Sequence, residues 1–178
     1  KKKVLMIMKE QNLNALLIFR QESMYWLTGY DTFGYVFFQC LVLKDNGEIV
    51  LLTRAPDLRQ AQNTSNIENI KIWVDKDGSN PTDDLKKILD ELNLKGKNLG
   101  VEYEAYGLTG RNTLKLNKSL DNYCSIQDKS ELINKLRVVK SNEEIVHVKK
   151  AAELADRALD EVWKHAKAGV SESKILAE

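Results

Sequence analysis

The chain has 178 residues, of which 43% are hydrophobic and 30% are charged, and its formal net charge is +1. This composition is typical of a globular protein, and the near-zero charge argues against a nucleic-acid partner or an acidic membrane partner. No apolar run approaches the roughly 20 residues that a membrane-spanning helix needs. Cys40 and Cys124 match no metal or redox spacing, so we interpret them as packed side chains in a reducing, cytoplasmic compartment.

Apolar periodicity and turn residues predict alternating helices and strands over most of the chain. In chain order we expect a helix (3–11), a strand (15–19), a short helix (24–27), two strands (35–43 and 48–53), a helix (55–63), a strand (70–74), a helix (82–92), a strand (98–102), a helix (106–120), a strand (123–126) and a short helix (130–136). The run at 15–19 is apolar on both faces. Asn46-Gly47 indicates a hairpin, and Ser23 is expected to cap the short helix at 24–27. The pattern predicts an α/β fold with a mixed β-sheet flanked by helices.

A long amphipathic helix of about 26 residues is predicted near the end of the chain. Its start has the capping-box pattern, with Ser141 at the N-cap and Glu144 three residues later, and Gly169 is expected to cap its end. The apolar positions form one stripe: Ile145, Val148, Ala152, Ala155, Leu159, Val162 and Ala166. We expect this stripe to lie on a large sheet, with a coiled coil as the alternative.

The end of the chain predicts a second domain. Ser171 starts a further helix, and the sequence stops at Glu178 within its first turns. Because a domain seldom ends at the start of a helix, we expect these residues to continue into a further domain. The predicted domains are residues 1–130, an N-terminal α/β domain, and residues 131–178, a linker helix with the beginning of the next domain.

Two segments of the chain resemble one protein family. Residues 24–31 (MYWLTGYD) are similar to the N-x-x-Y-L-T-G-Y/F segment in the N-terminal domain of creatinase and Xaa-Pro dipeptidase (proline peptidase) proteins. Residues 136–145 (LRVVKSNEEI), followed by Ala151-Ala152 and Ala155-Asp156, resemble the first helices of the "pita-bread" catalytic domain of that family. Residues 169–172 (GVSE) match the G-x-(S/T)-E that follows them. The resemblance covers nearly the whole chain.

This resemblance implies the non-catalytic N-terminal domain of a metal-dependent hydrolase that resembles Xaa-Pro dipeptidase. In active peptidases of the family, two divalent metals (Mn, Co or Zn) are held by two Asp, one His and two Glu, and they activate a water molecule. By the resemblance, those ligands belong to the C-terminal catalytic domain. His147 and His165, the only histidines, are separated by five helical turns and cannot share a metal. We therefore expect neither metal ligands nor catalytic residues in this chain.

The resemblance also implies a homodimer in which a loop of the N-terminal domain reaches the active site of the partner. By position this loop is residues 30–35, and Asp31, Phe33 and Tyr35 are the candidate residues of the substrate pocket. Aromatic faces suit the narrowing of a pocket, a carboxylate suits a substrate ammonium group, and Gly34 is expected to be a flexible joint. The alternative is that the aromatic side chains of this loop close the hydrophobic core.

The sequence departs from creatinase directly after this loop. Creatinase carries a Phe-Gly-Arg segment there for binding its substrate carboxylate, whereas this chain has Val36-Phe37-Phe38-Gln39. Arg20 and Arg54 are possible substitutes, and their spacing selects neither. We therefore favour a parent that cleaves the bond before proline. The alternatives are a hydrolase of the creatinase or ectoine-hydrolase type, which opens C–N bonds in small compounds, and a non-enzymatic peptide-binding member of the family.

Overall fold

The computed structural model describes residues 1–178 and divides them into two compact units, Lys1–Leu136 and Arg137–Glu178. The elements in chain order are α1 (Lys2–Glu10), β1 (Ala15–Ile18), α2 (Gln21–Thr28), the 3₁₀ turn η1 (Phe33–Val36), β2 (Cys40–Lys44), β3 (Ile49–Arg54), the 3₁₀ turn η2 (Ala55–Asp57), α3 (Leu58–Thr64), β4 (Asn69–Trp73), α4 (Pro81–Glu91), β5 (Asn98–Val101), α5 (Gly110–Leu120), β6 (Ser125–Asp128), α6 (Ser130–Val138), α7 (Asn142–His165) and α8 (Glu172–Ala177). No helix combines the length and the apolar character needed to cross a membrane.

The first unit contains one six-stranded sheet in the order β4-β3-β2-β1-β5-β6. Strand β2 runs antiparallel to both of its neighbours, β1 and β3. All the other pairs are parallel, so five strands share one direction and β2 alone opposes them. This confirms the predicted mixed sheet flanked by helices.

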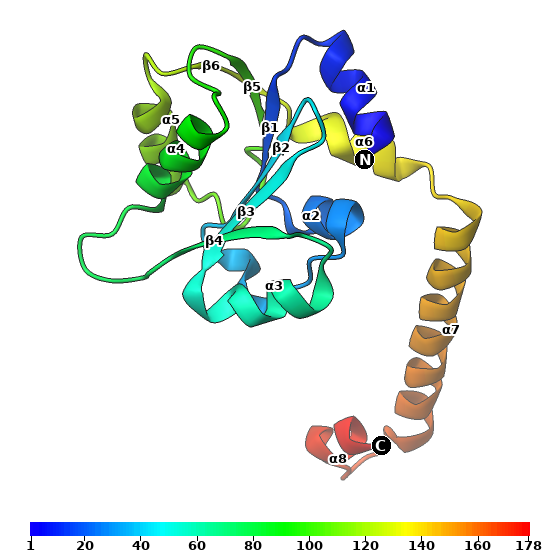
Figure 1. The fold of residues 1–178 in the computed structure, drawn as a ribbon. Coiled ribbons are helices and arrows are strands. Elements are labelled where there is room, and N and C mark those ends of the chain that lie inside the picture. The colour runs from blue at the N-terminus through cyan, green and yellow to red at the C-terminus, as the bar shows by residue number, and fades with distance from the viewer. The chain divides into compact units, whose positions relative to one another are not determined.

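Helices cover both faces of this sheet, as Figure 1 shows. On one face, α4 and α5 contribute buried residues such as Leu85, Leu89 and Leu116 to the core. On the other face, α1, α2, α3 and α6 pack with residues such as Met24 and Ile133. All four residues of β1 are buried, which confirms the prediction of a central strand covered on both sides.

The hairpin predicted from Asn46-Gly47 is present between β2 and β3, which pair from Cys40 with Leu52 to Leu43 with Ile49. The strand predicted over residues 35–43, however, is wrong in its first half. Residues 33–36 form the turn η1, and β2 begins only at Cys40. Residues rich in β-branched and aromatic side chains favour a strand locally, but here they form a loop that buried polar side chains stabilise.

Two predicted helix starts are also corrected. Ser23 does not cap α2, because the helix already begins at Gln21 and the Ser23 hydroxyl donates instead to the carboxylate of Glu102, 2.6 Å away. The helix predicted over residues 106–120 begins only at Gly110, with Thr109 as its N-cap. A side chain that can cap a helix can equally serve a distant partner, and only the folded structure decides between these uses.

The second unit contains the predicted long helix, α7, and the short helix α8. The capping box is confirmed: the Ser141 hydroxyl accepts the N–H of Glu144 at 3.2 Å, and the Glu144 carboxylate accepts the N–H of Ser141 at 2.7 Å. The helix ends earlier than predicted, because Ala166 is its C-cap and Gly169 lies in the turn before α8. No side chain of α7 is buried, so its apolar stripe remains exposed within this chain.

Candidate functional site

The loop between α2 and β2, residues 29–39, lies at the end of the sheet where the parallel strands have their carboxyl ends. Its neighbours there include Arg54, the last residue of β3, and the segment 102–109 that follows β5. In open α/β sheets this end, at the carboxyl ends of the strands, is where ligand sites are usually found. The loop therefore has the position expected of a functional site.

A buried polar network ties this loop to the sheet. The fully buried Tyr30 donates its hydroxyl to the side-chain oxygen of Gln39 at 2.6 Å, and this hydroxyl also lies 3.1 Å from the Thr53 hydroxyl. The Gln39 amide in turn donates to the carbonyl of Gly34 at 2.7 Å. Burial raises the pKa of Tyr30, so this side chain stays a neutral hydrogen-bonding group.

A second set of bonds holds the middle of the loop. The Thr32 hydroxyl donates to Asp57 at 3.1 Å and accepts the N–H of Gly34 at 2.9 Å, and Asp57 pairs with Arg54 at 3.2 Å. A β-carbon at Gly34 would lie only 2.5 Å from both Asp57 and Gln39. Glycine is therefore needed here for close packing, and the expected flexible joint is instead a point of tight contact.

The network holds an exposed aromatic surface, which we call the aromatic face. It consists of Phe33, Tyr35, Phe37 and Tyr106, which are 89%, 45%, 40% and 75% exposed. The rings of Tyr35 and Tyr106 meet edge to face, with centroids 5.7 Å apart. The guanidinium of Arg54 lies 3.4 Å from the centroid of the Phe37 ring. Exposed aromatic side chains beside an arginine are typical of binding surfaces.

The turn before α5, which contains Tyr106 and Gly107, packs against the backbone of the loop that carries the aromatic face. A β-carbon at Gly107 would lie 2.2 Å from the carbonyl oxygen of Phe37 and 3.2 Å from that of Tyr35. Tyr106 was not among the residues predicted for the site, because the sequence placed it inside a helix. The sequence feature that could have placed it correctly is Thr109. As the N-cap of α5, Thr109 marks the start of the helix and leaves Tyr106 and Gly107 in the preceding turn.

The structure places the predicted pocket residues in different surroundings. Phe33 and Tyr35 are exposed on the aromatic face, while Tyr30 closes the core. Asp31 is exposed, its N–H donates to the Thr64 hydroxyl at 3.1 Å, and its carboxylate forms no hydrogen bond or ion pair in the chain. The Asp31 carboxylate therefore remains available for a charged ligand.

The structure also distinguishes Arg20 from Arg54, the two arginines considered as substitutes for the carboxylate-binding arginine of creatinase. Arg20 is bound to its neighbour Glu104 through both the backbone carbonyl and the carboxylate of that residue, each at 3.0 Å. Arg54 instead stacks on Phe37 and pairs with Asp57. Of the two, only Arg54 contacts the aromatic face.

No group of three histidine, cysteine, aspartate or glutamate side chains is close enough to hold a metal ion. His147 and His165 both belong to α7, where His165 lies 3.7 Å from Glu161. Burial raises the pKa of the Cys40 thiol well above its ordinary value and that of Cys124 to about 11, so neither is a reactive thiolate. The donors in this chain do not fit a metal pair.

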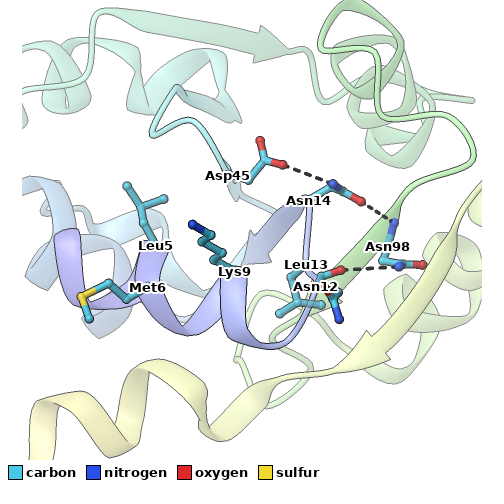
Figure 2. A pocket seen from close by; sticks show the side chains of 8 residues that line it. All are labelled: Leu5, Met6, Lys9, Asn12, Leu13, Asn14, Asp45 and Asn98. Carbon is cyan, nitrogen blue, oxygen red and sulfur yellow. Dashed lines mark hydrogen bonds between the residues drawn. The ribbon is translucent and has the colours of Figure 1, made fainter.

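A groove in the first unit lies at the opposite end of the sheet, where the parallel strands begin (Figure 2). Its volume is about 630 Å³, and it is lined by Leu5, Met6, Lys9, Asn12, Leu13, Asn14, Asp45 and Asn98. The polar groups bond to one another: the Asn14 amide donates to Asp45 at 3.2 Å, the N–H of Asn98 donates to Asn14 at 3.2 Å, and the Asn98 amide donates to the carbonyl of Asn12 at 3.4 Å. These asparagines serve the connections between strands, and the groove contains no catalytic set of residues.

Comparison with known proteins agrees with this fold. Residues 1–139 match the family described as the Creatinase/Prolidase N-terminal domain. The chain belongs to this family. It is 26% identical over 178 residues to the ectoine hydrolase of Halomonas elongata, covering 96% of this chain and 44% of that protein.

Two solved structures with the same fold are an X-Pro aminopeptidase from Thermotoga maritima and the Creatinase/Prolidase N-terminal domain of an X-Pro dipeptidase from Streptococcus pyogenes. The first has a TM-score of 0.78 at 20% identity, covering 99% of this chain and 46% of that one. The second has a TM-score of 0.61 at 14% identity, covering 75% of this chain and 95% of that one. At these identities the likeness establishes the fold alone. This creatinase/prolidase-type chain spans about half the length of the longer relatives that it matches.

Proposed function

We propose that this chain is the non-catalytic N-terminal domain of a hydrolase of the Xaa-Pro dipeptidase type, and that its aromatic face completes the active site of a partner subunit. In this proposal the whole protein is a cytoplasmic homodimer, and a divalent metal pair (Mn, Co or Zn) is held by its C-terminal catalytic domain. The domain would supply walls for the substrate pocket, and the catalytic domain would supply the chemistry.

The observation that carries this proposal is the contrast between the two sides of the loop 29–39. On its inner side, the side chains of Tyr30, Thr32 and Gln39 are buried and hydrogen-bonded. On its outer side, Phe33 and Tyr35 are exposed, although exposing aromatic surface to water is unfavourable. A rigid loop that presents apolar side chains is suited to binding, because little conformational entropy is lost when a partner covers it.

Asp31 and Arg54 add charge selectivity to this surface. The free carboxylate of Asp31 would bind the ammonium group of a dipeptide. The stacked guanidinium of Arg54 would add a positive charge, which its bond to Asp57 partly compensates.

The alternative is a hydrolase that opens C–N bonds in small compounds. The observation that favours it is the match to an ectoine hydrolase along 96% of this chain. A small compact substrate would need a narrower pocket than a dipeptide, and the exposed ring of Phe33 could provide it. Assays of the full-length protein with Xaa-Pro dipeptides and with ectoine would distinguish the two activities.

The proposal is tested by truncating the aromatic side chains in the full-length protein. We expect Phe33→Ala and Tyr35→Ala each to raise KM for the preferred substrate by about 10-fold or more, because each removes apolar contact with the bound substrate. Removing metal with a chelator should abolish turnover, and adding Mn²⁺ should restore it.

The matched control is Leu114→Ala, which removes an apolar side chain of α5 whose exposure, 73%, lies between those of Tyr35 and Phe33. This variant should leave kcat and KM unchanged. Unchanged kinetics in both the Phe33 and the Tyr35 variants would contradict the proposed role of the aromatic face.

A further inference from the structure

We propose that Glu102 is a positioning residue for the aromatic face: its carboxylate joins the two segments that hold this face in place. The inference deepens the proposed function, and it rests on the role proposed there for the aromatic face. Glu102 is buried and lies outside the exposed loop.

Glu102 occupies a special position in the topology of the sheet. Strands β1 and β5 are parallel neighbours, and the chain leaves β1 towards β2 on one side and β5 towards β6 on the other. In open α/β sheets such a point leaves a crevice at the carboxyl ends of the two strands, where ligands commonly bind. Here Glu102 directly follows β5, and only 3% of its surface is exposed.

Its carboxylate takes the place that an anionic ligand would have in such a crevice. One oxygen accepts the N–H groups of Phe19 and Arg20, at 3.2 and 2.8 Å, and the other accepts the hydroxyl of Ser23 at 2.6 Å. These donors belong to the first turn of α2 and the residues just before it, where the helix dipole favours a negative charge. Glu102 therefore acts as an internal anion that fixes the start of α2.

The first segment leads from α2 to the loop. Gln21, the first residue of α2, donates its side-chain amide to the carbonyl of Tyr30 at 2.7 Å. At the other end of the helix, the Thr28 hydroxyl accepts the N–H of Tyr30 at 3.2 Å. Tyr30 is the anchor of the buried network, since its hydroxyl binds Gln39. A shift of α2 would therefore be transmitted directly to the loop.

The second segment begins at Glu102 itself. The chain continues through Tyr103, whose N–H donates to the Ser130 hydroxyl at 3.0 Å, and reaches Tyr106 and Gly107 within five residues. The ring of Tyr106 meets that of Tyr35 edge to face, and Gly107 packs against the same part of the loop. Glu102 thus connects the loop that carries Phe33, Tyr35 and Phe37 with the turn that carries Tyr106.

The competing explanation is that Glu102 only stabilises the start of α2. The two explanations differ in which segments open locally when the carboxylate is removed. A positioning residue predicts local opening of residues 30–39 and 103–109, whereas a simple cap predicts opening of the first turn of α2 alone.

Amide hydrogen exchange on the chain 1–178 tests this difference. In Glu102→Ala we expect exchange of residues 30–39 and 103–109 to become about 10-fold faster, while β2 and β3 change much less. Glu102→Gln should not accelerate exchange in these segments, because its amide oxygen can accept the two N–H groups and its amide nitrogen can donate to Ser23.

Two further measurements keep the test decisive. The control Glu104→Gln removes the exposed ion pair with Arg20, 3.0 Å long, and should leave exchange at the aromatic face unchanged. In Glu102→Ala, about 0.2 M sodium acetate should restore protection, because acetate can occupy the emptied anion position, whereas sodium chloride at the same concentration should not. If Glu102→Ala does not fold, Ser23→Ala removes a single hydrogen bond and should give a smaller change in the same two segments.

Faster exchange confined to the first turn of α2, or spread evenly over the sheet, would overturn the proposal. This experiment needs no substrate, so its failure would leave the proposed function standing. Conversely, unchanged kinetics in the Phe33 and Tyr35 variants would remove the proposed function while leaving the exchange result intact.

Discussion

At the scale of single residues, the buried polar side chains of this domain gather at one place. Nine polar or charged side chains are buried: Ser23, Thr28, Thr32, Gln39, Thr53, Asp57, Thr82, Glu102 and Ser130. All but Thr82 and Ser130 contribute to the network behind the aromatic face or to the start of α2. No buried side-chain nitrogen or oxygen lacks a hydrogen-bond partner. Fully bonded polar networks hold one conformation rigidly, and this one is concentrated behind the surface proposed to bind.

The pH dependence of stability should reveal the buried carboxylate. Burial raises the pKa of Glu102 above its ordinary value, although the hydrogen bonds from Ser23 and Arg20 oppose this effect. The folded state therefore binds this proton more tightly than the unfolded state, and the resulting stabilisation is present at low pH and is lost as the pH rises through the folded-state pKa. Glu102→Gln, which stays neutral, should thus gain stability relative to the wild type between about pH 4 and pH 8.

Urea unfolding of both proteins across this range measures the difference in the free energy of unfolding. Asp128 provides a useful comparison, because its hydrogen bonds to Ser130 lower the pKa of its carboxyl. Asp128→Asn should therefore lose stability relative to the wild type only as the pH rises towards about 4, the ordinary pKa of an aspartate, and the difference should stay constant above that pH. Parallel profiles for wild type and Glu102→Gln would show that the Glu102 carboxylate is not perturbed by burial.

At the scale of elements, the close contact between the turn before α5 and the loop before β2 organises the aromatic face. The two segments are far apart in sequence, and they approach so closely that only a glycine fits at position 107. Helix α5 begins just after this contact, capped by Thr109. The position of Tyr106 therefore depends on the packing of its neighbour.

Substitution of two glycines tests this contact. Gly107→Ala should destabilise the fold by about 1–3 kcal/mol, because the new methyl group would overlap the carbonyl of Phe37 and the backbone must move. Gly110→Ala is the matched control: it lies at the first position of α5 with nothing within 4 Å of its added methyl group. That change should be neutral or stabilise by about 0.4–1 kcal/mol. Equal unfolding free energies for the two variants would contradict the close contact.

At the scale of the whole chain, the two units differ in how they are stabilised. The first unit has cores on both faces of its sheet. The second consists of α7 and α8, which bury no side chain. An isolated helix is marginally stable even when it is well capped, so the apolar stripe of α7 needs a surface to pack against.

Shortening the chain tests this separation. A chain that ends at residue 139 should unfold cooperatively with a midpoint within about 2 °C of the full chain, because it retains all the buried residues. A chain that ends at residue 129 also loses α6, with its buried Leu132 and Ile133, and should be destabilised by several kcal/mol, on the order of 2–5. Thermal unfolding followed by circular dichroism measures both. A large loss of stability in the longer fragment would show that α7 supports the first unit.

Local signals in the sequence predicted much of this protein. Periodicity and β-propensity identified the alternating elements and the mixed sheet, Asn46-Gly47 identified the hairpin, and Ser141 with Glu144 identified the capping box. The family was recognisable from two short segments. These features depend on residues within a few positions of one another, so the sequence alone contains what is needed to infer them.

The tertiary structure decided how the candidate site is assembled. The first half of the strand predicted over residues 35–43 instead forms a loop, in which Gln39 turns inward to bind Tyr30. The Ser23 hydroxyl does not cap a helix as expected but donates to the carboxylate of Glu102, 79 residues away. Tyr106 joined the aromatic face from a distant turn. Each of these contacts joins residues that local pattern does not relate, because their geometry is set by the packing of the sheet between them.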